Sequence, residues 1–130
     1  MGRTADYSKE TCSIAATLEV VGDPWTLLIL RDAFRGVRRF EQWQERLGVA
    51  RNVLAARLKS LVEHGVLEQQ PYSERPPRYV YELSAAGAEL AGALRLLADW
   101  GARSSDREPL PRCDACGQPV LDEDGALDYV

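Results

Sequence analysis

The sequence predicts a mainly α (α+β) domain of the winged helix-turn-helix type, in which a two-stranded β-hairpin forms the wing and further helices lie at both ends. Three observations predict this fold. Two short amphipathic stretches flank the Gly-containing connection 48–50, as in a helix-turn-helix. A proline-rich turn, 71–77, separates two strand-like stretches, as in a hairpin. Apolar residues then recur at helical spacing over 85–103.

Two helices are predicted before the helix-turn-helix. The first covers residues 11–21, where three apolar residues have the spacing of one buried stripe: Ile14, Leu18 and Val21. Asp23 is a typical N-cap, and the proline after it suits the first turn of a helix over 25–34. This second helix is apolar nearly all round, which predicts a central, buried position.

The helix-turn-helix and its wing come next. Helices are predicted over 39–47 and 51–64, and the glycine at position 65 ends the second of them. Strands are predicted over 66–70 and 78–83, with a seven-residue tip between them. A helix-turn-helix followed directly by such a hairpin is the winged-helix arrangement.

Ser84 is predicted to cap one long helix over 85–103. That helix carries two adjacent apolar stripes: Leu90, Leu94, Leu97 and Ala93, Leu96, Trp100. Because a small domain covers only one side of such a helix, the second stripe indicates a partner subunit, with a tail that folds back as the alternative. The domain is therefore assigned to 11–103, between an N-terminal arm, 1–10, and an acidic, loosely ordered tail, 104–130.

Charge is unevenly distributed along the 130 residues, whose net charge is −4. Residues 31–60 contain eight basic and three acidic side chains, which gives this segment a net charge of +5. A basic segment inside an acidic protein indicates a surface for a polyanion such as DNA. The alternative is a solvated, arginine-rich helix face without a function.

The helix over 51–64 is expected to be the recognition helix that binds double-stranded DNA. Such a helix lies in the major groove and presents its N-terminal turns to base edges. Arginine can bond guanine and asparagine can bond adenine, whereas alanine reads little beyond a thymine methyl. Arginines before the helix over 39–47 and in the wing suit phosphates, and the wing also suits the minor groove. The candidate DNA contacts are Arg38, Arg39, Arg51, Asn52, Ala55, Ala56, Arg57, Lys59, Arg75 and Arg78.

The sequence does not indicate an enzyme. It contains no glycine-rich phosphate loop and no catalytic serine or metalloprotease motif. The one histidine, His64, is expected to interact with a helix C-terminus. The absence of a long apolar run and of a secretory signal leads us to expect no membrane association and a cytoplasmic location.

The order and spacing of several strings resemble the HxlR-type bacterial transcriptional regulators, relatives of the MarR winged-helix proteins. The resemblance covers about residues 11–101. It rests on Cys12, GDPWTLLILR (22–31), RF (39–40), VLAARLKSL (53–61), GVL (65–67), PPRYVYELS (76–84), Gly87, Trp100 and Gly101.

This resemblance implies a homodimer, paired through its first and last helices, that binds pseudo-palindromic operator DNA, with repression favoured over activation. The chain departs from the family pattern at three places. Asp23 and Pro24 replace a glycine and a basic residue, Ala50 replaces a capping serine, and alanines at 55 and 56 replace polar residues. These changes remove a cap and two base contacts, which weakens the expected sequence readout.

The three cysteines leave several readings open. Cys12 matches the family's N-terminal cysteine, which in some members senses oxidants or electrophiles. Its expected position at the start of a helix favours a thiolate. The alternative is a half-buried structural thiol. Cys113 and Cys116 have the spacing of half a zinc site. Zinc held by two tails, a redox pair and an unligated tail all remain open, and no other cofactor is expected.

Two functions of different classes follow. The favoured one is a sequence-specific DNA-binding regulator that responds to an oxidant or to a small-molecule inducer. The alternative is a winged-helix dimer that binds a protein or a ligand without recognising an operator. The basic segment 31–60 favours the regulator, and the alanines at 55 and 56 favour the alternative.

Overall fold

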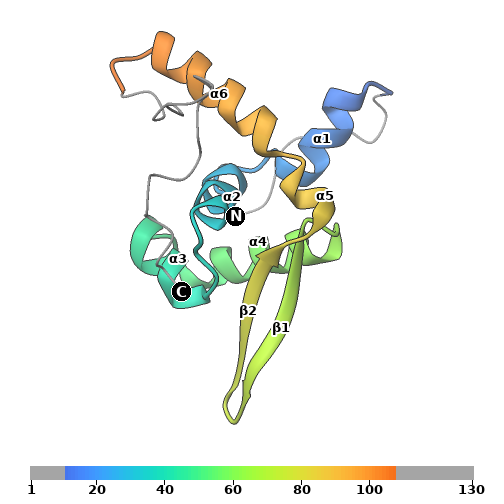
Figure 1. The fold of residues 1–130 in the computed structure, drawn as a ribbon, viewed down its shortest axis with the longest axis vertical. Helices are drawn as coiled ribbons and strands as arrows, with labels where there is room; N and C mark the ends of the chain where they lie inside the picture. Colours follow the sequence, from blue (N-terminus) through green and yellow to red (C-terminus); the bar gives the residue numbers. More distant parts are fainter. Residues whose placement is uncertain (1–10, 108–130) are drawn as a thin grey trace, which may run out of the picture.

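The structure, a computed structural model, describes residues 11–107. The described part is mainly helical and contains one antiparallel hairpin, so the predicted fold class is confirmed. Figure 1 shows the first and last helices at one end of the molecule and the hairpin projecting from the other. The predicted arm and most of the predicted tail, with Cys113 and Cys116, lie outside the described residues.

The first helix is α1 (Ser13–Val21); Cys12 is its N-cap and Gly22 is its C-cap. Its buried residues are Ala15 and Val21, whereas Ile14 is 73% exposed. The predicted stripe is therefore right at Val21 and wrong at Ile14, since Ala15 occupies the buried position in the first turn.

The second helix, α2 (Thr26–Phe34), is the central element of the core. Its N-cap position is Trp25, not the predicted Asp23. Asp23 lies two residues earlier, and its Oδ1 atom accepts hydrogen bonds of 3.0 Å from the backbone N–H groups of Trp25 and Thr26, which satisfies the start of the helix. Ile29 and Leu30 are completely buried, as the sequence predicts. Leu28 is an exception, since it is 37% exposed.

The helix-turn-helix consists of α3 (Phe40–Leu47) and α4 (Arg51–Glu63). Gly48 ends α3 in the left-handed region, with φ of 66°, which is why a glycine occupies the turn. Trp43 of α3 is fully buried and donates a hydrogen bond of 3.0 Å from Nε1 to the carbonyl of Ile29. The apolar face of α4 completes this core with Leu54, Leu58 and Leu61.

The wing consists of β1 (Leu67–Glu74) and β2 (Pro77–Leu83), paired from Leu67 opposite Leu83. The strands are longer than predicted, and the tip shrinks to residues 75–76. A two-stranded ribbon has only edge strands, and edge strands are where a sheet accommodates proline. The pairing register shifts between Pro71 and Ser73, which places Tyr72 in a bulge.

The predicted long helix over 85–103 is broken in the structure into α5 (Ala85–Ala88) and α6 (Ala91–Arg103). Ser84 caps α5 as expected, accepting a hydrogen bond of 3.0 Å from the N–H of Gly87. A side chain at position 87 would lie 2.1 Å from the carbonyl oxygen of Val66, so α5 is pressed against the start of the wing. Bonds from residues 89 and 90 to the carbonyls three residues earlier then tighten the backbone and interrupt the helix.

Within α6, Leu94 is buried but the second predicted stripe is open to solvent. In this second stripe Leu96 is 72% exposed and Trp100 is 64% exposed. Leu97 is 51% exposed, so the first predicted stripe is wrong at that position. No single helix between residues 11 and 107 is long and apolar enough to cross a membrane; α1 and α2 pass that test only as a pair, bent by 80°.

Candidate nucleic-acid interface

The exposed face of α4 carries the residues that the sequence analysis assigned to it. Its buried face contains Leu54, Leu58 and Leu61. The predicted contact residues on the opposite side are exposed: Arg51, Asn52, Ala55, Ala56 and Lys59. The polar ones among them are concentrated in the first turn, the part of a recognition helix that meets base edges.

The start of α4 has no side-chain cap, because Ala50 occupies the N-cap position and the first turn has no acidic residue. Its first N–H groups therefore remain available to an anion. Beside them, Arg51 donates a hydrogen bond of 3.0 Å from Nη1 to Oε1 of Gln44. The same guanidinium lies over the ring of Phe40, 4.7 Å from its centroid. These two contacts fix the position of the Arg51 guanidinium beside the first turn of α4.

The wing is attached to the start of α3. The N–H of Tyr81 donates a hydrogen bond of 2.8 Å to the carbonyl of Arg38, and Arg39 bridges to Val80. Arg38 Nη1 lies 3.0 Å from Glu82 Oε1, and both side chains are about two-fifths exposed. Arg39 is exposed, with its guanidinium 4.6 Å from the centroid of Tyr72. The helix-turn-helix and the wing thus present one continuous surface.

Several arginines of the basic segment 31–60 are engaged in internal ion pairs. The fully buried carboxylate of Asp32 lies 3.1 Å from Arg31 Nε and 3.2 Å from Arg46 Nη2, which joins α2 to α3. Arg57, a predicted DNA contact, lies 2.9 Å from Asp23 Oδ1 with only 12% of its side chain exposed. The exposed positive charge that remains around α4 is contributed by Arg39, Arg51 and Lys59.

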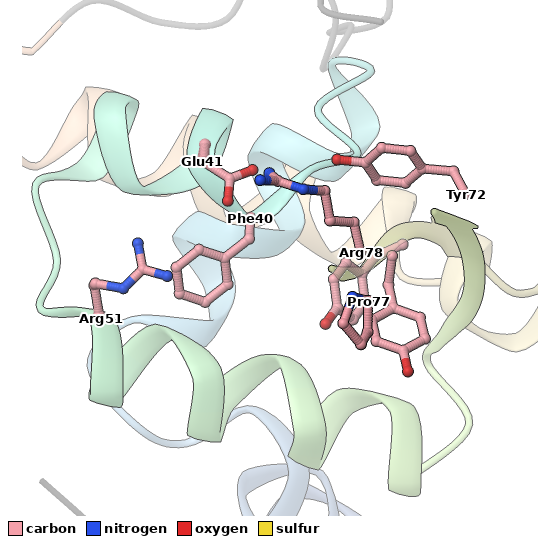
Figure 2. Close-up of a pocket in the computed structure, with 8 residues that line it drawn as sticks. Phe40, Glu41, Arg51, Tyr72, Pro77 and Arg78 are labelled. Atoms are coloured by element: carbon pink, nitrogen blue, oxygen red, sulfur yellow. The ribbon is translucent and has the colours of Figure 1, made fainter. Parts of the chain in front are cut away.

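The wing supplies two further exposed arginines. Arg75 lies at the tip of the hairpin and Arg78 lies near the start of β2. Within residues 11–107, no ion pair or hydrogen bond engages the guanidinium of Arg78. Figure 2 shows this side chain reaching from β2 toward Glu41 at the start of α3.

A cavity of about 180 Å³ lies between the wing and the helix-turn-helix (Figure 2). Its walls are Phe40, Glu41, Arg51, Tyr72, Pro77, Arg78, Tyr79 and Tyr81. Burial raises the pKa of Tyr81, and the nearby Tyr79 and Glu41 raise that pKa further. The Tyr81 phenol therefore stays neutral at physiological pH.

The aromatic members of this surface were not predicted from the sequence. Tyr72 and Tyr79 are large side chains that remain 42% and 39% exposed, and Phe40 supports Arg51. The sequence signal was three tyrosines on either side of two arginines in and around β2. Exposed aromatic residues next to arginines are typical of binding surfaces.

Cys12 is exposed, and its Sγ atom accepts a hydrogen bond of 3.4 Å from the N–H of Ala15. This contact resembles the capping of a helix by serine. Among residues 11–107, no group of three or more histidine, cysteine, aspartate or glutamate side chains has the arrangement of a metal site.

A helix-turn-helix with an exposed recognition face and a hairpin beside it defines a winged-helix domain of the kind found in transcriptional regulators. Residues 20–109 match the profile of the HxlR-like helix-turn-helix family. The chain therefore belongs to the HxlR-like helix-turn-helix family, and its curated relatives carry the name of HTH-type transcriptional regulators.

The chain is 46% identical over 108 residues to an uncharacterized HTH-type transcriptional regulator of Mycobacterium tuberculosis, a match that covers 83% of this chain. It spans only 64% of the length of that relative. It is 34% identical to the uncharacterized HTH-type regulator YtcD of Bacillus subtilis, over 78% of this chain and 82% of that one. The crystal structure of PA1607, provisionally assigned as a transcription factor, superposes with a TM-score of 0.73 at 40% identity, covering 88% and 82% of the two chains.

Proposed function

We propose that the protein is a homodimeric, sequence-specific regulator that binds pseudo-palindromic operator DNA in the cytoplasm and acts as a repressor. The observation that carries this proposal is the exposed first turn of α4, with Arg51 and Asn52 beside an uncapped helix start. A helix presented in this way suits the major groove, where arginine reads guanine and asparagine reads adenine.

The remaining exposed cations suit phosphates on either side of α4. Arg39, stacked on Tyr72, and the wing residues Arg75 and Arg78 would contact the backbone, and Lys59 would contact it further along α4. Ala55 and Ala56 allow close approach of the helix to the groove floor. Arg38 and Arg57 are paired with carboxylates. Arg38 would position the wing and Arg57 would position α4, and neither would be a primary DNA contact.

The exposed apolar side chains of α1 and α6 support pairing of two copies of this chain. Both helices lie at the end of the molecule opposite the wing tip, so a dimer formed there leaves both recognition helices free (Figure 1). Two-fold pairing also accounts for a pseudo-palindromic site, with half-sites about 10 base pairs apart. The side chains that such an interface would cover are Ile14, Leu96, Leu97 and Trp100.

We further propose that oxidation of Cys12 is one inducing signal, because Cys12 is exposed and its sulfur accepts a backbone hydrogen bond at the start of α1. A covalent change at this sulfur removes the cap of a helix in the proposed dimer interface. Zinc or a disulfide at Cys113 and Cys116 remains a separate proposal, checked by zinc analysis and thiol titration of the full chain.

The deciding experiment is a gel-shift titration of reduced and mildly oxidised protein on DNA from upstream of its own gene, against random DNA. Tight, selective binding by reduced protein supports the regulator, and release after oxidation, lost in Cys12→Ser, supports the redox signal. A lack of preference over random DNA in both states contradicts the regulator and favours the protein- or ligand-binding module. A reporter gene behind the same DNA distinguishes repression from activation.

A further inference from the structure

Two small apolar side chains lie on the exposed face of α4, just beyond its first turn. Ala55 and Ala56 are both exposed, and they follow Arg51 and Asn52 by about one helical turn. The exposed positions within α3, the other helix of the motif, carry charged side chains instead: Glu41, Glu45 and Arg46. Within the helix-turn-helix, the exposed apolar pair is therefore particular to α4.

Of the two alanines, Ala56 lies nearer the centre of the exposed face. It follows Asn52 by one turn and precedes Lys59 by one turn, so these three side chains form one line along the helix. The opposite side of α4 is the leucine face that is buried in the core. Since an α-helix rises about 1.5 Å per residue, Ala56 lies about 6 Å beyond Asn52 along the axis, which is about two base-pair steps of B-DNA.

A methyl group at this position restricts what α4 can contact in DNA. It forms no hydrogen bond with a base and has no charge to attract a phosphate. Among the base edges in the major groove, the C5-methyl of thymine is the one apolar group, and alanine is one of the side chains that contact it. The same methyl group is present on 5-methylcytosine, so the chemistry that fits Ala56 is a pyrimidine with a C5-methyl group.

We infer that Ala56 reads the C5-methyl group of a pyrimidine in each half-site, about two base pairs from the base that Asn52 contacts. The inference rests on the proposed operator binding, and it adds which chemical group the operator must carry at this position. Arg51 and Asn52 select bases through hydrogen bonds, whereas Ala56 selects through burial of a methyl group. Burial of one such group corresponds to about a fourfold gain in affinity.

The test removes single methyl groups from the DNA. An operator is first isolated by its preference over random DNA, and each thymine of a half-site is then replaced with uracil, which keeps every hydrogen-bonding group and lacks only the methyl. Fluorescence anisotropy with the full chain should show a position at which uracil weakens binding about fourfold.

Two glycine variants assign that difference to a side chain. Ala56→Gly should bind the thymine and uracil operators equally well. Ala88→Gly, the same change at an exposed alanine of α5, should keep the full difference. Because each variant is compared with itself on two DNAs, any loss of stability caused by glycine in the helix cancels in the ratio.

A second comparison distinguishes the two sources of the methyl group. Cytosine and 5-methylcytosine are placed in turn at the sensitive position. Tighter binding of the methylated base, by about fourfold, supports recognition of the methyl group itself. Equal binding of the two cytosines overturns the extension to 5-methylcytosine and leaves thymine as the recognised base.

Three further results would count against the inference in different ways. If no uracil substitution weakens binding, Ala56 reads no methyl group, while the selective regulator stands. A thymine preference that persists in Ala56→Gly also overturns the inference, because another side chain then reads the methyl group. A protein without any preference over random DNA contradicts the proposed function, and the inference falls with it.

Discussion

Arg57 Nε lies 2.9 Å from Asp23 Oδ1, and both side chains are largely buried, with exposed fractions of 12% and 14%. The pair joins the middle of the recognition helix α4 to the residue that caps α2. Asp23 therefore has two roles, since the same carboxylate accepts backbone hydrogen bonds and balances the arginine. The orientation of α4 on the core depends on this contact.

Replacing Arg57 with Gln should destabilise the fold by about 2–4 kcal/mol, because it leaves a carboxylate with little solvent and no cation. Urea unfolding followed by circular dichroism measures the loss. Asp23→Asn, which keeps an oxygen for the α2 N–H groups, should cost less than Asp23→Ala, which also removes the cap. An unfolding free energy unchanged in Arg57→Gln would contradict this stabilising role.

Much of the fold was predictable from local signals, and the failures have physical causes. Gly48 and Gly65 adopt positive φ where the sequence placed helix ends, and Asp23 accepts hydrogen bonds at the start of α2, although the N-cap position itself is Trp25. The break after α5 was not predictable, because it depends on Gly87 packing against the carbonyl of Val66. That contact joins residues far apart in the sequence, and periodicity does not report it.

The candidate interface was predictable as a face but not as a set of contacts. The spacing of the leucines in α4 defined which side is exposed, and Arg51 and Asn52 are on it. The sequence could not distinguish Arg57, which is paired internally, from Arg51, which is stacked on Phe40. Charge alone does not reveal whether a carboxylate from another element lies beside an arginine.

Replacing Asn52 with Ala should relax base preference, at a cost of about 1–3 kcal/mol on the specific site and little on random DNA. The reason is that a bidentate contact to a base edge is lost while phosphate contacts remain. Fluorescence anisotropy on both DNAs gives the difference. Glu63→Ala, at the other end of α4, is the matched control and should leave the ratio of specific to random DNA affinity unchanged. Equal losses on both DNAs for Asn52→Ala would show that Asn52 does not read a base.

Replacing Arg39 with Ala should weaken binding to all DNA sequences alike and reduce the slope of log affinity against log salt by about one. Tyr72→Leu should act in the same direction but less strongly, because it removes the ring under Arg39 and leaves the charge. Salt titrations of operator affinity measure both effects. Arg103→Ala removes one charge at the far end of α6 and should leave the slope unaltered; a wild-type slope in Arg39→Ala would place Arg39 outside the phosphate contacts.

Stability should decline with rising pH above about pH 10 because of Tyr81. Its pKa is raised by burial, so the folded protein retains the phenol proton after the unfolded chain has lost it. The stabilising contribution is complete below the unfolded pKa and is lost as pH rises through the folded one. Tyr81→Phe keeps the ring against Trp43, at 6.0 Å between centroids, and should show a shallower decline in urea unfolding. Identical pH profiles would assign the decline to other groups.

Replacing Leu96 with Lys should convert the proposed dimer to a monomer, because this side chain is 72% exposed in the single chain and belongs to the apolar face of α6. A charge buried at the centre of such an interface costs several kcal/mol, while the isolated subunit has no reason to unfold. Sedimentation velocity measures the oligomeric state, and circular dichroism verifies the helix content. Gln70→Lys, an exposed change in β1, adds the same charge away from α6 and should remain dimeric. If Leu96→Lys and Trp100→Lys together leave a dimer of wild-type affinity, the two copies pair through a surface other than α6.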